Sequence, residues 1–196
     1  MLRLSVETQP PINPITVDDV KAQSIIDHDL DDSLISSYIT AARQWCEGYL
    51  NRALITTRYK MVLDAWPVSE CLDIPRPPLV GIESFTYIDK DDNSATLTIA
   101  DTFVVSTVGT PGRIALKDGV NWPTTELRPI AGIEIVFDAG YGSGATDVPE
   151  AIRQAVKLVA ADLYENRESS VVGAGLTVAE VPFGAKALLN MFRVDP

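Results

Sequence analysis

Histidine and cysteine are almost missing from this chain of 196 residues, which has one histidine and two cysteines. A metal centre with several imidazole or thiolate ligands, and a catalytic triad built on histidine, are therefore hard to assemble. Cys46 and Cys71 lie far apart and form no CxxC pair, and we interpret both as buried free thiols. His28 stands among carboxylates, which indicates a surface residue.

Positive charge is also scarce, because 16 Lys and Arg stand against 27 Asp and Glu, for a formal net charge of -11 at pH 7. The basic residues are scattered, and most have acidic neighbours, as Arg153 has in Glu150. Tight binding of nucleic acid requires clustered Lys and Arg that neutralise phosphates. The composition therefore excludes a protein that grips nucleic acid, although an acidic surface can face DNA that slides past it.

Long apolar runs are a third absence, since no window reaches the roughly 20 residues that a membrane helix needs. The segment Met1–Glu7 turns polar at once and lacks the apolar core of a signal peptide. We therefore expect no membrane partner and a protein that stays in the cytoplasm in which it is made. With 46% hydrophobic and 22% charged residues, the composition is that of an ordinary globular chain.

Two acidic runs, 27–32 and 89–93, are candidate calcium loops. An EF-hand loop needs Gly at its sixth position and Glu at its twelfth. Counted from Asp27, these positions hold Asp32 and Tyr38, and counted from Asp89 they hold Ser94 and Ala100. We interpret the first run as a turn followed by a helix cap and the second as a hairpin turn.

The glycine-rich segment 140–144 follows an expected strand and precedes an expected helix, as a phosphate-binding loop does. It lacks both the Gly-Lys-Ser/Thr ending of a P-loop and the GxGxxG spacing of a dinucleotide site. We interpret it as a crossover from sheet to helix. The sequence thus predicts no catalytic residue, no metal and no cofactor.

Hydrophobic spacing divides the chain into helices near both ends and strands between them. A short helix is expected after Thr16, fading near Ser24, and a longer one after Asp31 or Asp32, ending near Asn51. Alternating strand-like runs fill about 58–139, with Pro75–Pro78 separating two of them. Helices are expected again over 149–166 and after Pro182. The fold class is therefore α+β: a helical bundle built from both chain ends with an inserted small antiparallel β lobe.

The expected domain organisation follows from this order of elements. Residues 1–14 form an extended lead-in that is rich in proline, residues 15–57 and 147–196 a helical domain, and residues 58–146 the inserted β lobe. The apolar stripe of the 149–166 helix is expected to pack against the 34–49 helix.

Several short stretches, in this order and spacing, resemble the head–tail connector (head-completion adaptor) family of tailed bacteriophages and prophages. The stretches are Ile15–Lys21, Asp31–Ile35 running to Ala41–Arg43, Asn51–Thr56, Ile74–Leu79, Tyr87–Asp89, Pro111–Ile114, Trp122–Pro123, Phe137–Gly142, Val148–Ile152 and Leu163–Glu168. The resemblance implies a structural, non-enzymatic subunit of the virion neck. Such a protein forms a ring, with about a dozen copies, beneath the portal protein. It meets a tail or stopper protein on the other side, and duplex DNA passes through the hole.

Two surfaces are candidates for the contacts of such a ring. The 149–166 helix should leave Arg153, Lys157, Glu165 and Arg167 outside, where they could pair with Asp27, Asp29 or Asp31 of the next subunit; a merely solvated helix face is the alternative. The last helix carries Phe183, Leu188, Met191 and Phe192. We expect this apolar segment to dock on a neighbouring subunit or the portal and to be mobile in the lone monomer.

Two other function classes compete with the connector. The first is a stand-alone module whose β lobe binds a ligand or another protein, and the second is an enzyme with an unfamiliar site. The size of the protein in solution separates the connector from the stand-alone module, because only the connector forms rings.

The charge pattern leads to a first prediction. The isolated protein should show no appreciable binding to duplex DNA at physiological salt, because no basic stripe can neutralise phosphates. A fluorescence anisotropy titration with a labelled duplex tests this, and micromolar binding that weakens with added salt would contradict it.

Overall fold

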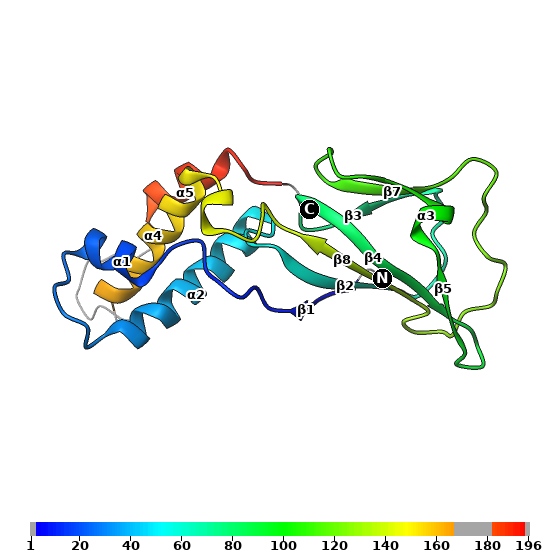
Figure 1. Ribbon diagram of the computed structural model, residues 1–196, viewed down its shortest axis with the longest axis horizontal. Helices are drawn as coiled ribbons and strands as arrows, with labels where there is room; N and C mark the ends of the chain where they lie inside the picture. The colour runs from blue at the N-terminus through cyan, green and yellow to red at the C-terminus, as the bar shows by residue number, and fades with distance from the viewer. Residues whose placement is uncertain (1–2, 167–181, 195–196) are drawn as a thin grey trace, which may run out of the picture. The chain divides into compact units, whose positions relative to one another are not determined.

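A computed structural model of the chain describes residues 3–166 and 182–194. These residues contain both helices and antiparallel strands, which confirms the predicted α+β class. The chain divides into two compact units (Figure 1). The first, here called the β unit, takes Met1–Pro11 and Thr56–Tyr141, and the second, the helical unit, takes Ile12–Ile55 and Gly142–Pro196.

The β unit contains a five-stranded antiparallel sheet with the order β1-β2-β8-β4-β5. Its strands are β1 (Arg3–Thr8), β2 (Thr57–Leu63), β4 (Leu79–Ile88), β5 (Ser94–Leu97) and β8 (Ile133–Ala139). Along the central strand β8, residues alternate between buried and half-buried, with Ile133, Ile135 and Phe137 on the buried face. Tyr59 of β2 pairs with Phe137 across the ladder, so the large apolar side chains of neighbouring strands share that face.

A second, three-stranded sheet has the order β3-β7-β6 and is made of β3 (Cys71–Ile74), β6 (Phe103–Ser106) and β7 (Gly112–Leu116). A four-residue helix, α3 (Ile99–Thr102), leads into β6. Aromatic rings join the sheets: the centroid of Phe85 lies 5.0 Å from that of Phe103 and 5.6 Å from that of Trp122. These contacts form the core of the β unit.

The β region differs from the sequence prediction in three respects. The expected single sheet over 58–139 is two sheets, because periodicity indicates strands but not their partners. The helix α3 lies inside the range 58–139, in which only strands were expected. The extended lead-in contains β1, which pairs antiparallel with β2; Leu4 and Val6 alternate as in a strand, and the first proline is Pro10.

The helical unit contains α1 (Val17–Ser24), α2 (Asp32–Leu50), α4 (Glu150–Glu165) and α5 (Phe183–Asn190), with a short 3-10 helix, η1 (Ala145–Asp147), before α4. Thr16 caps α1 in a capping box with Asp19, as its sequence predicts. Asp31 precedes α2 but makes no capping bond, because its carboxylate accepts a hydrogen bond from the hydroxyl of Tyr164 at 2.8 Å. That bond ties the end of α4 to the start of α2.

The core of the helical unit lies between α2 and α4, which pack against each other as the sequence predicts. Ile152, Val156 and Val159 of α4 are buried, and so are Ile35 and Ile39 of α2. In Figure 1, α5 lies beside α4, and Ala185 and Leu189 are its buried residues. The helical unit therefore combines α1 and α2, which precede the β strands β2 to β8, with α4 and α5, which follow them. Helices this short are stabilised mainly by packing against one another.

Two side chains lie at depths other than the expected ones. Arg43 of α2 is only 4% exposed, although arginine usually lies at the surface. Its guanidinium donates to Asn13 and to Glu47, and Glu47 in turn accepts from the backbone N–H of Leu54. Cys46 is buried, as expected, but Cys71 is exposed, because strand β3 turns that side chain to solvent.

The contact between the two sheets gives a second prediction. A side chain at Gly112 would place its Cβ 2.5 Å from the Cβ of Leu79, so Gly112→Val should destabilise the protein by about 1–3 kcal/mol through overpacking. Gly81→Ala is the matched control, because nothing lies within 4 Å of an added Cβ there. Urea unfolding of both variants tests this, and equal stability would contradict the tight contact.

Candidate assembly surfaces

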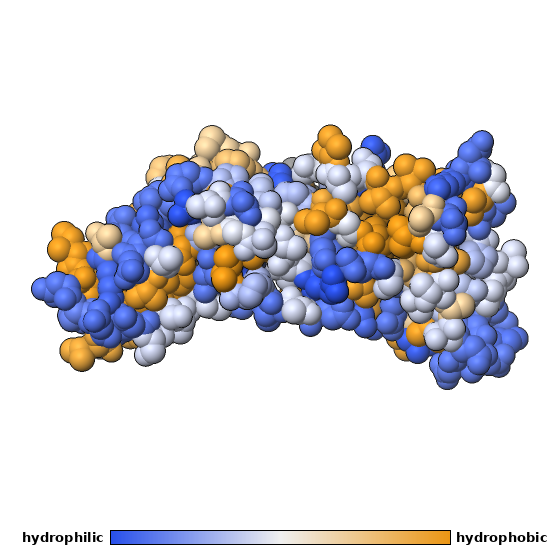
Figure 2. Space-filling view, in the orientation of Figure 1, coloured by the Kyte–Doolittle hydropathy of each residue, from blue (hydrophilic) through white to orange (hydrophobic). Residues whose placement is uncertain are grey.

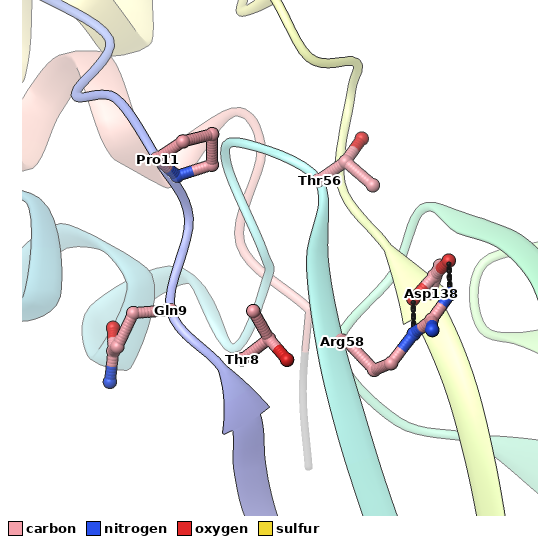
Figure 3. A pocket seen from close by; sticks show the side chains of 6 residues that line it. All are labelled: Thr8, Gln9, Pro11, Thr56, Arg58 and Asp138. Atoms are coloured by element: carbon pink, nitrogen blue, oxygen red, sulfur yellow. Dashed lines mark hydrogen bonds and ion pairs between the residues drawn. The ribbon is translucent and has the colours of Figure 1, made fainter.

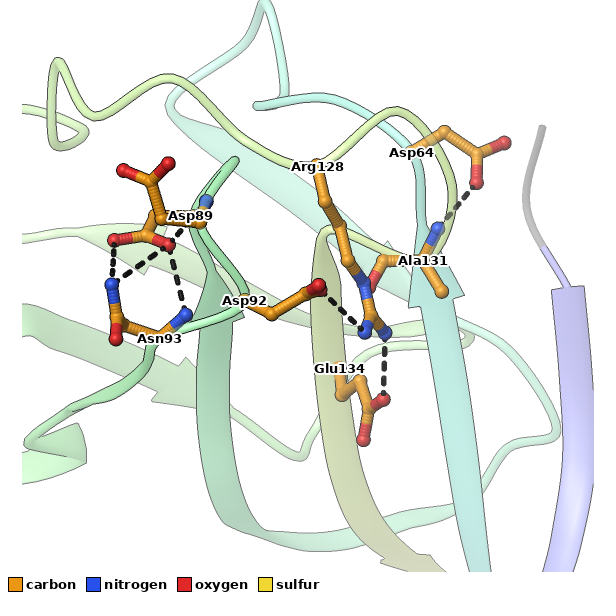
Figure 4. A network of polar contacts seen from close by, with 8 residues as sticks. Asp64, Asp89, Asp92, Asn93, Arg128, Ala131 and Glu134 are labelled. Atoms are coloured by element: carbon orange, nitrogen blue, oxygen red, sulfur yellow. Dashed lines mark hydrogen bonds and ion pairs between the residues drawn. The ribbon is translucent and has the colours of Figure 1, made fainter.

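In the acidic turn at Asp89–Asn93, the carboxylate of Asp89 is bonded within the turn and that of Asp92 pairs with Arg128 (Figure 4). Asp89 accepts hydrogen bonds from the backbone N–H groups of Asp91 and Asn93, each at 2.9 Å. The side chain of Asn93 also donates to Asp89, and these bonds lower the pKa of Asp89 below its ordinary value. This is the hairpin turn that the sequence predicts, between β4 and β5.

The acidic run 27–32 is held by a lysine instead of a metal. Lys21 pairs with Asp29 at 2.6 Å and with Asp32 at 2.5 Å, and the hydrogen bond from Lys21 lowers the pKa of Asp29. Among residues 3–166 and 182–194, no group of three or more His, Cys, Asp and Glu could hold a metal ion. In the same part of the chain, no helix is long and apolar enough to cross a bilayer.

The glycine-rich crossover holds a carboxylate where a phosphate loop would hold an anion. Asp147 accepts a hydrogen bond from the backbone N–H of Gly144 at 2.8 Å. A Cβ at Gly142 would lie 2.2 Å from an oxygen of the same carboxylate, so glycine is required there. Because a fixed negative charge occupies this turn, it is unsuited to bind a nucleotide phosphate.

A pocket of about 230 Å³ lies in the β unit, between the end of β1 and the start of β2 (Figure 3). It is lined by Thr8, Gln9, Pro11, Thr56, Arg58 and Asp138. Arg58 donates two hydrogen bonds of 2.8 Å to Asp138, which raise the pKa of the guanidinium, and also pairs with Glu83. Most residues that line this pocket are polar or charged, and Arg58 and Asp138 are paired with each other, whereas a typical ligand site is lined mainly by apolar and aromatic side chains.

The charges on α4 are not the free outer face that we expected. Arg153 is 22% exposed; it donates to the backbone carbonyl of Pro14 at 3.1 Å and pairs with Glu150 at 2.6 Å. Lys157 is 19% exposed and pairs with Asp19 of α1 at 3.7 Å. Sequence spacing missed this because α1 and the segment before it cover that side of α4.

The other two charged residues expected on this surface are Glu165 and Arg167. Glu165, at the end of α4, is exposed. Arg167 lies outside the described residues. The acidic partners proposed for a neighbouring copy are also partly engaged within the chain: Asp29 pairs with Lys21, and Asp31 accepts from Tyr164. Arg153 and Lys157 are therefore engaged within the single chain, and a ring contact through this surface stays a prediction.

The last helix is divided between core and surface. Ala185 and Leu189 are buried against the helical unit, Leu188 and Phe192 are half-buried, and Phe183 and Met191 are 86% and 71% exposed. The hydroxyl of Tyr49 donates to Asn190 at 2.7 Å, and Arg52 donates to the carbonyl of Phe192 at 2.5 Å. The helix thus packs in its own chain and still leaves an apolar face open. Its docking on a neighbouring subunit or on the portal stays a prediction.

Comparison with known proteins gives a family and a fold. The model of a family described as "Phage gp6-like head-tail connector protein" matches residues 14–76 and 116–193. A search of curated protein sequences finds no significant match.

Solved structures extend the likeness over nearly the whole chain. A chain in the neck of an empty gene transfer agent particle, computed with C6 symmetry, is 25% identical over 99% of this chain and 96% of its own, with a TM-score of 0.81. The neck of the native particle, computed with C12 symmetry, contains a chain that is 25% identical over 99% of this chain and 96% of its own, with a TM-score of 0.75. A chain of the native virion shares the fold at 23% identity, with a TM-score of 0.80, over 98% of this chain and 96% of its own.

The pairing of α4 with the N-terminal part of the helical unit gives a third prediction. Arg153→Glu should lower the free energy of unfolding by about 1–2 kcal/mol, because it removes a hydrogen bond from a charged group and places a carboxylate beside Glu150. Glu165→Lys, at an exposed position of the same helix, should stay within about 0.5 kcal/mol of the wild type. Urea denaturation of the monomer measures both; an unchanged Arg153→Glu variant would show that this charge faces solvent.

Proposed function

This chain belongs to the family of phage gp6-like head-tail connector proteins, and we propose that it forms a ring in the neck of a phage-like particle, beneath the portal protein. In that position it joins the DNA-filled head to the tail. Host cytoplasm is the compartment in which the ring would assemble. The observation that carries this proposal is the fold match over 99% of the chain to a protein of a particle neck.

The two units have different parts in this proposal. The helical unit, in which α1 and α2 pack with α4 and α5, acts as a helical bundle that forms the connector domain. The β unit is an insertion between its two segments, close to the 58–146 lobe expected from sequence. Support comes from the family match, which covers the four helices of the helical unit and omits residues 77–115 of the β unit.

We further propose the partners of the ring. The necks to which this chain is similar have cyclic symmetry, C6 in one reconstruction and C12 in another, which supports a ring with about a dozen copies. The portal protein would lie on its head side and a tail or stopper protein on the other. Duplex DNA would pass through without being gripped, which agrees with a net charge of -11.

This function needs no catalysis. The family and the structural neighbours are structural phage proteins, and the polar clusters among the described residues are turns, caps and ion pairs of the fold. The charged side chains of these clusters have partners within their own unit. Arg58 pairs with Asp138, and Asp147 accepts a hydrogen bond from the N–H of Gly144. We therefore propose that the chain contributes surfaces to an assembly.

A fourth prediction tests the proposed function. Particles produced without this chain should accumulate as heads that lack tails, and adding the purified protein to these heads should restore tail attachment. Electron microscopy measures the tailed fraction, and averaging of the restored necks should show a ring of this chain. Normal tailed particles in its absence would contradict the proposal.

A further inference from the structure

The turn after α1 holds an isoleucine in a backbone conformation that isoleucine avoids. Ile25 has φ of +53°, and the N–H groups of Ile25 and Ile26 both bond to the carbonyl of Lys21, which ends the helix. Glycine or asparagine usually occupies this left-handed position, because a β-branched side chain clashes there. The chain itself ends α2 in this way, with Asn51 at φ of +52°. Folding alone therefore gives no reason for isoleucine at 25.

The side chain of Ile25 is not used by its own unit either. It is 92% exposed, and Leu30, five residues further along the same loop, is 88% exposed. Around them stand four carboxylates, Asp27, Asp29, Asp31 and Asp32. Lys21 pairs with two of them, Asp29 and Asp32, so the rim keeps an excess of negative charge. In Figure 2, apolar atoms are visible among hydrophilic ones at this end of the helical unit. We name this pair, Ile25 and Leu30 with its acidic rim, the loop knob.

A surface of opposite charge lies on α5. Phe183, Ala187 and Met191 follow one another at a spacing of four residues, and all three are exposed. The segment 182–194 contains no Asp or Glu and has two basic residues, Lys186 and Arg193. Figure 2 shows apolar surface over α5. We name this stripe of three residues the α5 face.

We propose that the loop knob of one copy of this chain docks on the α5 face of the next copy. This inference rests on the proposed ring and names the two faces of its contact. A rotational ring needs a heterologous interface, in which two different patches of one subunit meet around the axis. The two patches are both apolar, their rims carry opposite charge, and complementary rims set register and association rate.

The position of the two patches in the helical unit suits such a contact. The loop knob lies just before α2, whose first turn is held by the Tyr164–Asp31 bond. The last turn of α5 lies by the other end of α2, where Tyr49 bonds to Asn190. Because α2 has 19 residues, it is about 28 Å long. One subunit therefore cannot bring its own knob to the Met191 end of its own α5 face, whereas successive copies can.

A stability-neutral substitution separates docking from folding. The double variant Ile25→Asn, Leu30→Ser replaces the strained residue by the one that the chain uses at Asn51, so the melting temperature of the monomer should stay the same or rise. The concentration for half-maximal association, measured by sedimentation velocity or on portal-bearing heads, should rise about tenfold or more, because two apolar side chains leave the interface. The matched control is the double variant Val68→Ser, Val108→Asn, which removes two similarly exposed apolar side chains from the β unit. It should change neither the melting temperature nor the concentration for half-maximal association.

Cysteine crosslinking detects the contact even where association is weak. In a Cys71→Ser background, which removes the exposed native thiol, Leu30→Cys with Met191→Cys should yield a ladder of disulfide-linked multimers under mild oxidation. Val108→Cys with Met191→Cys should yield none. Because the knob and the face lie on different copies, mixing the Leu30→Cys chain with the Met191→Cys chain should give mainly linked dimers.

The outcomes separate this inference from the proposed function. The first outcome is a double variant that enters rings as readily as the wild type, together with a Leu30→Cys, Met191→Cys pair that forms no more multimers than the control pair. That result would contradict the contact between the loop knob and the α5 face and would leave the proposed ring unaffected. If a portal protein crosslinks to Met191→Cys in place of a second copy, the α5 face binds the portal and the docking is again wrong. If heads lacking the chain gain tails normally, the connector function itself fails.

Discussion

The packing of α4 on α2 is the interaction on which the rest of the helical unit depends. It joins a segment before the β unit to a segment after it, through a buried apolar stripe that neither helix could hide alone. The points where the chain leaves the helical unit and returns to it are pinned together by a parallel bridge between Ile55 and Gly142. A long insertion is tolerated there because its two ends are already adjacent, so the entropic cost of closing the loop grows only slowly with its length.

The same packing decides which charges remain available to other molecules. Much of the chain's small stock of basic side chains is used inside the fold: Arg43 in a buried network, Lys21 on the loop after α1, Arg153 and Lys157 between α4 and the N-terminal segment. Pairs of this kind hold segments that are distant in sequence. Because each ion pair also uses a carboxylate, the pairing leaves the net charge of -11 unchanged and leaves few basic side chains free to bind an anionic partner.

Two groups of exposed apolar side chains in the helical unit take no part in its core. A solitary exposed apolar side chain is ordinary in a soluble protein. The loop after α1 and the outer side of α5 each expose more than one, on opposite charge backgrounds, and Ile25 does so in a strained backbone conformation. In a protein whose work is assembly, such features are where specificity resides, because they are maintained without benefit to the folded monomer.

The sequence by itself determined the class of the fold, the helices α1, α2, α4 and α5, the inward stripe of α4, the capping of α1 by Thr16 and the family. These follow from periodicity, local hydrogen bonding and the order of short motifs, all of which are properties of neighbouring residues. Tertiary structure alone decided that the strands form two sheets, that the lead-in supplies β1, that Arg43 is buried and that Arg153 and Lys157 are engaged by residues before and within α1. The physical reason is that strand partners and ion-pair partners are chosen by what packs nearby in space, and at sequence separations of 30 to 139 residues, as for Asn13 with Arg43 and Pro14 with Arg153, no local pattern records that choice.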